Sequence, residues 1–426
     1  MRRSGGAGSD DSQSSAAPPA GGETAYVGDA SALAALGERL RAALANDPRM
    51  GIDTEFIRER TYKPVLEIVQ VATNDGFIGI VDVPALGGEL GPLGDLLLDP
   101  SVLKILHSGA QDMEILGARL GALPAPVYDT QVAAAFAGFS MQTGYGALVQ
   151  SLLGVQLSKE EGFADWSHRP LSPSMLAYAE NDVRYLHALH DGLSARLARL
   201  GRTEWAQEQT GRILGGMLDE VAPEDLWRRV NGRSGLDGRQ LAVVRELAIW
   251  RDTEAQRRDK PRRSVVKDEV FVEVARRLPQ TAAAVLALRG VHQGVGEKYA
   301  EAMADCVRRG LAVPQEARPR VESAPPLDDQ GAALVELLSA VVRARALEEK
   351  LPPSLLAGSD DLRALAAHRR RPDFGGPLFT GWRSQLVGDA LRDVLTGRVA
   401  VGWDPAPGRL TLKRAADPKK DADATA

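Results

Sequence analysis

The chain has 426 residues, a formal net charge of −5 and a single cysteine, Cys306. Its length exceeds what one ordinary hydrophobic core supports, so we expect two or three domains. The single cysteine excludes an internal disulfide and a cysteine metal cluster. No apolar run approaches the ~18 residues of a membrane span. The net negative charge argues against general binding of polyanions.

The first part of the chain is predicted to begin an α/β fold. Residues 1–22 are rich in Gly, Ser, Asp, Ala and Pro, and we expect a disordered tail because they lack the apolar core of a signal peptide. A helix is expected at 30–44. Strand-like runs follow at 50–56, 66–73 and 77–83, and an Asn-Asp-Gly turn joins the last two. These runs predict a hairpin sheet.

The first of these strands carries two acidic residues. Asp53 and Glu55 stand at i and i+2, so both carboxylates point to one face of the strand. Two like charges this close resist ionisation unless a cation lies beside them, which predicts a divalent metal site. The simpler interpretation is that the pair forms the solvated face of an edge strand.

A third acid follows the next strand. A short buried strand at 102–106 ends in a Gly turn and leads into a helix with Asp112 in its first turn. There the helix dipole favours a carboxylate, near the carboxyl end of a strand where sites of α/β sheets gather. A helical piece at 93–98, a strand-to-helix run at 127–137 and a helix at 142–153 predict a mixed sheet with crossovers.

A fourth acid lies on a later helix. Residues 175–186 have helical spacing, and Pro173 near their start fits the first turn of a helix. Tyr178 and Asp182 stand at i and i+4, so the phenol and the carboxylate share one face.

These residues resemble a known family. The set Asp53, Glu55, Asp112 and Asp182, with Tyr178 four residues before the last acid, is similar to the three motifs of the DEDD exonuclease superfamily in its tyrosine-bearing branch. The ribonuclease D family is closer still, over residues 24–200. The stretches that carry this resemblance are Ile52-Asp53-Thr54-Glu55-Phe56, Arg60-Thr61-Tyr62-Lys63-Pro64, Leu106 to Asp112, Tyr128-Asp129-Thr130-Gln131, Asp165-Trp166 and Arg169-Pro170-Leu171.

The resemblance implies an α/β ribonuclease H-like exonuclease domain at 23–205, a mixed sheet with flanking helices. Such a domain hydrolyses phosphodiester bonds from RNA 3′ ends and releases nucleoside 5′-monophosphates. Two divalent ions, Mg²⁺ or Mn²⁺, are implied, and oxygen ligands select such hard cations. By the resemblance, Asp53, Glu55 and Asp182 hold the ion that activates water. Asp53 and Asp112 hold the ion beside the leaving oxygen, and Tyr178 orients the water.

The expected substrate is structured RNA with a 3′ trailer, tRNA precursors above all. We expect a cytoplasmic protein with no membrane partner and no obligate protein partner. An alternative enzyme is a single-strand DNA 3′–5′ exonuclease, because the same motifs serve DNA enzymes and no motif here reads a 2′-hydroxyl. The alternative from another class is a catalytically silent nucleic-acid-binding adaptor, although a silent copy would not need all four acids.

The second half of the chain is expected to hold two small all-α HRDC-like domains. Residues 206–235 are predicted to be a helical linker, and 236–313 resemble the HRDC domain that ribonuclease D shares with RecQ helicases. A Pro-rich linker at 314–326 leads to a second HRDC-like region at 327–412 and a loose tail at 413–426. The exonuclease domain is expected to have an independent core.

A basic patch lies in the first HRDC-like domain. The segment 257–267 holds six cations against one acid, a local charge of six minus one, or +5. We expect this patch to attract RNA phosphates. Its candidate nucleic-acid-binding residues are Arg257, Arg258, Lys260, Arg262, Arg263 and Lys267. The simpler interpretation is a solvated loop between helices.

Overall fold

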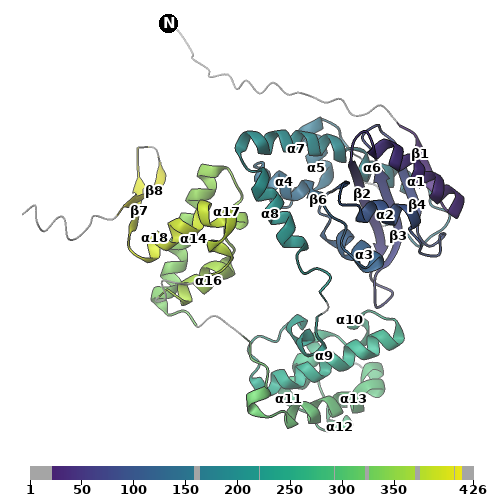
Figure 1. The fold of residues 1–426 in the computed structure, drawn as a ribbon. Coiled ribbons are helices and arrows are strands. Elements are labelled where there is room, and N and C mark those ends of the chain that lie inside the picture. Colours follow the sequence, from purple (N-terminus) through teal and green to yellow (C-terminus); the bar gives the residue numbers. More distant parts are fainter. Residues whose placement is uncertain are drawn as a thin grey trace, which may run out of the picture.

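The structure is a computed structural model that describes residues 22–157, 164–219, 221–291, 293–321, 326–369, 375–406 and 408–414. These residues form three lobes (Figure 1): an α/β N-terminal lobe (22–214), a helical middle lobe (223–312) and a C-terminal lobe (329–414). The predicted tail at 1–22 lies outside the described residues except for Gly22. No helix in the described ranges is both long and apolar enough to cross a bilayer.

A six-stranded mixed sheet organises the N-terminal lobe, as predicted. Its order is β1-β4-β3-β2-β5-β6. The strands are β1 (Thr24–Val27), β2 (Arg49–Ile57), β3 (Val65–Ala72), β4 (Ile78–Asp82), β5 (Leu103–Leu106) and β6 (Val127–Asp129). The central strand, β2, pairs antiparallel with β3 and parallel with β5. The edge strand β1 was not predicted, and it pairs in parallel with β4.

Helices cover both faces of this sheet (Figure 1). On one face, α1 (Ala30–Leu44), α2 (Gly91–Leu98) and α3 (Ala110–Leu120) bury leucines against Ile52, Val69 and Val71. On the other, α6 (Pro173–Arg184) and the start of α7 (Leu186–Leu200) pack on Ile68 and Ile80. Successive side chains of a strand point to opposite faces of the sheet, so the residues of β2 that alternate with Ile52 point toward α6. This face of β2 can therefore carry polar groups.

The remaining helices of this lobe are α4 (Thr130–Phe136), α5 (Tyr145–Leu153) and α8 (Thr203–Leu214). The predicted domain boundary after residue 205 falls inside α8, which continues for about another two turns. Ala206 and Thr210 are buried, so this part of the helix belongs to the folded lobe.

The middle lobe has a hydrophobic core of its own. Its elements are η1 (Pro223–Arg229), α9 (Gly238–Arg258), α10 (Arg262–Val265), α11 (Asp268–Arg277), α12 (Ala282–Leu286) and α13 (Gln293–Ala312), followed by the turn η2 (Gln315–Ala317). Leu226, Trp227 and Val230 pack into this core beside Phe271 and Met303. Residues expected to belong to a linker therefore contribute to the lobe itself.

The C-terminal lobe is helical except at its end. It contains α14 (Asp329–Glu349), α15 (Pro353–Leu356), α16 (Ser359–Ala367), η3 (Pro377–Phe379), α17 (Gly381–Arg383), the π-helical turn η4 (Ser384–Gly388), α18 (Asp389–Leu395), β7 (Val399–Asp404) and β8 (Arg409–Arg414). The prediction of an all-α region was wrong here, because β7 and β8 pair as an antiparallel hairpin. Alternating apolar residues such as Val401 and Leu412 turn one side of it to the core. Lys413 and Arg414 of the predicted tail belong to β8, and the rest of that tail lies outside the described residues.

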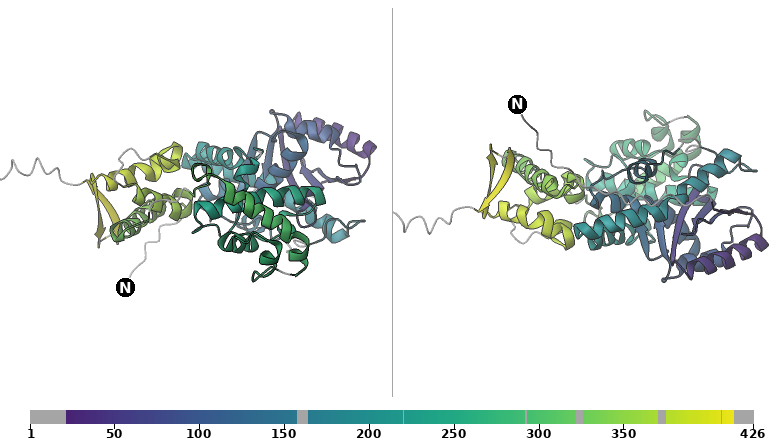
Figure 2. Two further views of the ribbon diagram at one scale, coloured as in Figure 1. Left: turned by 90° about the horizontal axis from the view of Figure 1, so that it is seen from below. Right: turned by 90° about the horizontal axis from the view of Figure 1, so that it is seen from above.

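The C-terminal lobe shares a core with the N-terminal lobe. Both views of Figure 2 show it against the helices of that lobe. Alanines of α4 and leucines of α7 pack with Leu338, Val341 and Trp382 in one buried cluster. The expected independent core is present around the sheet, where two buried clusters lie entirely within the N-terminal lobe. The side of this lobe that carries α4, α7 and α8 departs from the expectation, because the C-terminal lobe completes its core.

Candidate active site

The central strand β2 carries the first two acids. Asp53 and Glu55 alternate with the buried Ile52 and Thr54, so both carboxylates lie on the face that α6 covers. The register of β2 against β3 shifts between Glu55 and Phe56. Such an irregularity re-aims side chains and is frequent beside active sites.

The third acid is held by the turn between β5 and α3. Asp112 lies in the first turn of α3, and the hydroxyl of Thr54 donates a hydrogen bond to its carboxylate. Asp129 fixes the turn, because its two carboxylate oxygens accept hydrogen bonds from the backbone N–H groups of Ser108 and Gly109, each at 3.0 Å. Ser108 has a φ of 60°, a left-handed conformation that these bonds stabilise.

The fourth acid and the tyrosine come from α6. Ser172 caps this helix by accepting a hydrogen bond from the backbone N–H of Met175, and Pro173 fills its first turn, as the sequence indicated. Tyr178 and Asp182 share one face of the helix and lie close enough that, in addition to burial, the charge of Asp182 raises the pKa of the phenol. Ala179 and Val183, one position further along, are fully buried against the sheet, so the polar pair is held at the edge of this contact.

The carboxylates converge. One oxygen each from Asp53, Glu55 and Asp182 lie within 4.8 Å of one another, in an arrangement that could hold a metal ion. Asp112 is close enough to Asp53 and Glu55 for its charge to act on both. The structure therefore brings together all five residues that the sequence singled out in the exonuclease motifs.

The electrostatics of this cluster favour a cation. Burial and the neighbouring carboxylates raise the pKa of Asp53 well above its usual value and that of Glu55 to about 8. Burial raises the pKa of Asp182 to about 7 and that of Asp112 as well. Acids that resist ionisation without a counter-ion, and that offer only oxygen atoms, fit a hard divalent cation such as Mg²⁺ or Mn²⁺.

Two neighbours of the cluster were not assigned a role from the sequence. Gln70 is fully buried on β3 directly opposite Asp53, and its amide has no hydrogen-bond partner in the described part of the chain. The hydroxyl of Tyr145 donates to the carbonyl of Asn181 at 2.9 Å and accepts from the N–H of Tyr185 at 3.1 Å, so it fixes the end of α6. An amide in the otherwise apolar run from Ile68 to Ala72 was the signal for Gln70.

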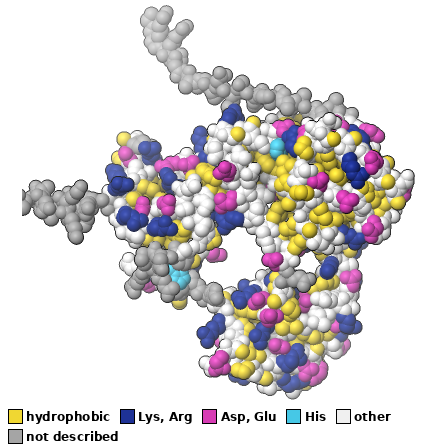
Figure 3. Space-filling view, in the orientation of Figure 1, with side chains coloured by type: hydrophobic (Ala, Val, Ile, Leu, Met, Phe, Trp, Pro, Cys, Tyr) yellow, Lys and Arg dark blue, Asp and Glu magenta, His cyan; other side chains and the backbone are white. Residues whose placement is uncertain are grey.

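The six candidate cations of the middle lobe do not form one free patch. Arg258 bonds to Tyr299, Arg262 bonds to Asp252, and Lys260 Nζ lies 3.3 Å from the carbonyl of Arg60. Five of the six are exposed, and only Arg262 is half-buried. Arg257 pairs with Glu254 and Arg263 with Asp268. In Figure 3, Lys and Arg side chains are scattered over the two helical lobes.

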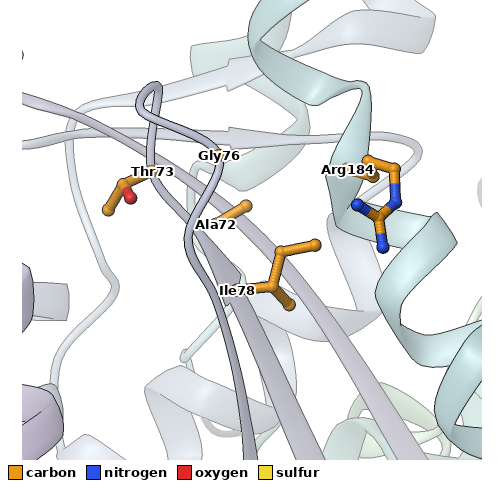
Figure 4. A pocket seen from close by; sticks show the side chains of 5 residues that line it. All are labelled: Ala72, Thr73, Gly76, Ile78 and Arg184. Atoms are coloured by element: carbon orange, nitrogen blue, oxygen red, sulfur yellow. The ribbon is translucent and has the colours of Figure 1, made fainter. Parts of the chain in front are cut away.

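Figure 4 shows a hollow at the surface of the N-terminal lobe. It lies between the β3–β4 turn and α6, and it is lined by Ala72, Thr73, Gly76, Ile78 and Arg184. Its accessible volume is about 10 Å³, which is room for roughly one water molecule. None of the candidate active-site residues lines it. The acids therefore mark the site, and this hollow does not.

Comparisons with known proteins agree with this geometry. The family described as "3'-5' exonuclease" matches residues 26–198, and the HRDC domain family matches residues 240–307. The chain is 40% identical over 382 residues to a ribonuclease D of Acidiphilium cryptum. That match covers 89% of this chain and 95% of the other protein. The chain is also 40% identical to a ribonuclease D of Gluconacetobacter diazotrophicus, covering 86% of this chain and 91% of that protein.

The fold has a solved counterpart. The crystal structure of Escherichia coli RNase D, an exoribonuclease involved in structured RNA processing, matches with a TM-score of 0.76 and 30% identity. The match covers 88% of this chain and 99% of that one, so the likeness extends over all three lobes.

Proposed function

The chain belongs to the ribonuclease D family and is a 3′–5′ exoribonuclease, and from this premise we propose that Asp53, Glu55, Asp112 and Asp182 bind its divalent cations while Tyr178 orients the attacking water. The observation that carries this proposal is the convergence of carboxylate oxygens from β2 and α6 within 4.8 Å. Strands and helices hold these groups on rigid elements, as positioning of a phosphodiester requires.

Two Mg²⁺ or Mn²⁺ ions suit this donor set. Asp53, Glu55 and Asp182 would hold one, and Asp53 with Asp112 the other, because Asp53 lies near all three other acids. When bound, such ions supply positive charge beside the phosphate oxygens and lower the pKa of water. The chain itself supplies the orientation: Thr54 fixes Asp112 through a hydrogen bond.

Tyr178 is assigned the role of orienting the attacking water, without taking its proton. Burial and the neighbouring acids raise the pKa of its phenol, so it stays protonated at neutral pH and cannot be a general base. Its hydroxyl is beside Asp182, where it can donate to or accept from a water that approaches the acids. A hydroxyl in this place restricts the direction of attack.

The substrate is proposed to be the 3′ trailer of structured RNA, tRNA precursors above all, with release of nucleoside 5′-monophosphates. The three lobes border an open gap in Figure 3, and the exposed Arg257, Arg263 and Lys267 of the middle lobe offer phosphate contacts. The adaptor alternative loses its basis because the acids form one site. A cytoplasmic location stays a prediction.

Digestion of matched RNA and DNA oligonucleotides tests the proposal. With Mg²⁺ or Mn²⁺ the full-length protein should shorten the RNA from its 3′ end, release 5′-monophosphates and stop when EDTA is added. Blocking the 3′ hydroxyl should protect the RNA. Equal or faster digestion of DNA would favour the single-strand DNA exonuclease.

A further inference from the structure

The loop between β2 and β3, residues 58–64, reaches from the N-terminal lobe to the middle lobe. At its tip, the hydroxyl of Tyr62 donates to Asp252 Oδ1 at 2.9 Å and accepts from Gln256 Nε2 at 3.0 Å and from Arg262 Nη2 at 2.6 Å. The guanidinium of Arg262 also lies over the Tyr62 ring, 4.7 Å from its centroid. We call Asp252, Gln256, Asp259 and Arg262 the Tyr62 socket.

Two further bonds hold the backbone of this loop. The N–H of Tyr62 donates to Asp259 Oδ1 at 3.0 Å, and Lys260 Nζ lies 3.3 Å from the carbonyl of Arg60. Tyr62 also packs at the margin of the middle lobe's core. Side chain and backbone are therefore both fixed by the middle lobe.

The same loop contacts the segment that leads to α6. Arg60 donates to Asp165 Oδ2 at 2.6 Å and to Ser167 Oγ at 2.7 Å. Between these two residues, Trp166 is buried, and its ring centroid lies 6.2 Å from that of Tyr178. Contacts therefore run from the socket through Tyr62, Arg60 and the 165–167 turn to Tyr178.

We propose that Tyr62 is a positioning residue for the exonuclease reaction, through which the middle lobe fixes the support of Tyr178. The inference rests on the role of Tyr178 proposed above. It gives the HRDC domain a part in the chemical step in addition to RNA binding.

The energetics explain why the loop needs this anchor. No residue of 58–64 is buried, and the Arg60–Asp165 pair is about half exposed, where an ion pair contributes little alone. The hydroxyl of Tyr62 makes three hydrogen bonds to groups that also bond one another, and such networks hold more firmly than single contacts. Loosening the socket should free Arg60 and the 165–167 turn together.

Full-length Tyr62→Phe tests the proposal, because it keeps the ring over Arg262 and removes only the hydroxyl. On a short single-stranded RNA with Mg²⁺, kcat should fall about 3- to 10-fold, as expected for one lost hydrogen-bonding group, while KM stays unchanged. Arg60→Ala should lower kcat similarly, and the double variant should lower it no further. Tyr299→Phe is the matched control, since that hydroxyl bonds to Arg258 and Glu254 inside the middle lobe and should leave kcat unchanged.

Hydrogen exchange gives a readout that does not depend on activity. In Tyr62→Phe, amides of both 58–64 and 165–168 should exchange faster than in the wild type. Unchanged kcat, or faster exchange confined to 58–64, would overturn the proposal and leave Tyr62 as an interdomain contact alone. A wild type inert toward RNA would defeat the proposed function, and exchange at 165–168 would still decide whether the middle lobe acts on this turn.

Discussion

Phe136 of the N-terminal lobe and Trp382 of the C-terminal lobe meet edge to face, with ring centroids 4.9 Å apart and an interplanar angle of 84°. Both side chains are fully buried. Arg202 closes the contact, since it donates to the carbonyl of Phe136 at 3.1 Å and to that of Glu349 at 2.7 Å. The two lobes are therefore joined by one core although more than 200 residues separate the two rings.

Trp382→Ala should destabilise the whole N-terminal lobe. The substitution leaves a large cavity in a shared core and should cost about 3–5 kcal/mol in urea unfolding. Trp403→Ala is the control, because that ring is 64% exposed and its loss should change stability by no more than about 0.5 kcal/mol. A Trp382 variant with unfolding unchanged would mean that the lobes fold separately.

Asp53→Asn should abolish activity and stabilise the metal-free protein. The amide keeps the shape but removes a charge from among three other acids, so turnover should fall by more than about 100-fold, while the Tm in EDTA rises. Protection by Mn²⁺ in thermal unfolding should weaken at the same time. Near wild-type turnover in a folded Asp53→Asn protein would contradict the metal assignment.

The stability of the metal-free protein should depend on pH through Glu55. Its folded pKa, about 8, lies above its unfolded value, so the folded state binds more protons between pH 5 and 8. This contribution is fully present below the unfolded pKa and is lost as pH rises through the folded one. In EDTA, the stability of Glu55→Gln relative to wild type should therefore increase from pH 5 to 8. A constant difference would show that Glu55 ionises normally.

Tyr178→Phe should separate turnover from binding. The ring and its packing near Trp166 remain and only the hydroxyl is lost, so kcat should fall by ~10²–10⁴-fold while RNA affinity stays near normal. Binding is measured on a Ca²⁺ complex or with a non-hydrolysable RNA. Weak binding with normal turnover at saturation would make Tyr178 a residue that stacks on the substrate.

The exposed arginines of the middle lobe should contribute to RNA affinity. Replacing Arg257 and Arg263 together by Gln should weaken binding of long structured RNA and flatten its salt dependence, by up to about 0.9 in the log–log slope for each phosphate contact on duplex and about 0.7 on single strands. Short oligonucleotides should be unaffected. Arg277→Gln, an equally exposed arginine paired with Glu273, is the control. An unchanged slope with long RNA would reduce this surface to a solvated loop.

The sequence by itself determined the local geometry of the site. A strand places Asp53 and Glu55 on one face because its side chains repeat every two residues, and a helix aligns Tyr178 with Asp182 because four residues make about one turn. These relations need only the backbone within a few residues. The motif order then identified the family, which the comparisons confirmed.

Only the tertiary structure decided which distant residues meet. Gln70 faces Asp53 because of strand register, Tyr62 enters its socket because two lobes dock, and Trp382 completes a core begun by Phe136. The sequence pattern marked Arg262 as a candidate RNA-phosphate contact, whereas the structure pairs it with Asp252 and Tyr62. Such contacts form because packing together surfaces from distant segments of the chain lowers the free energy. The local periodicity of the sequence does not predict which surfaces meet.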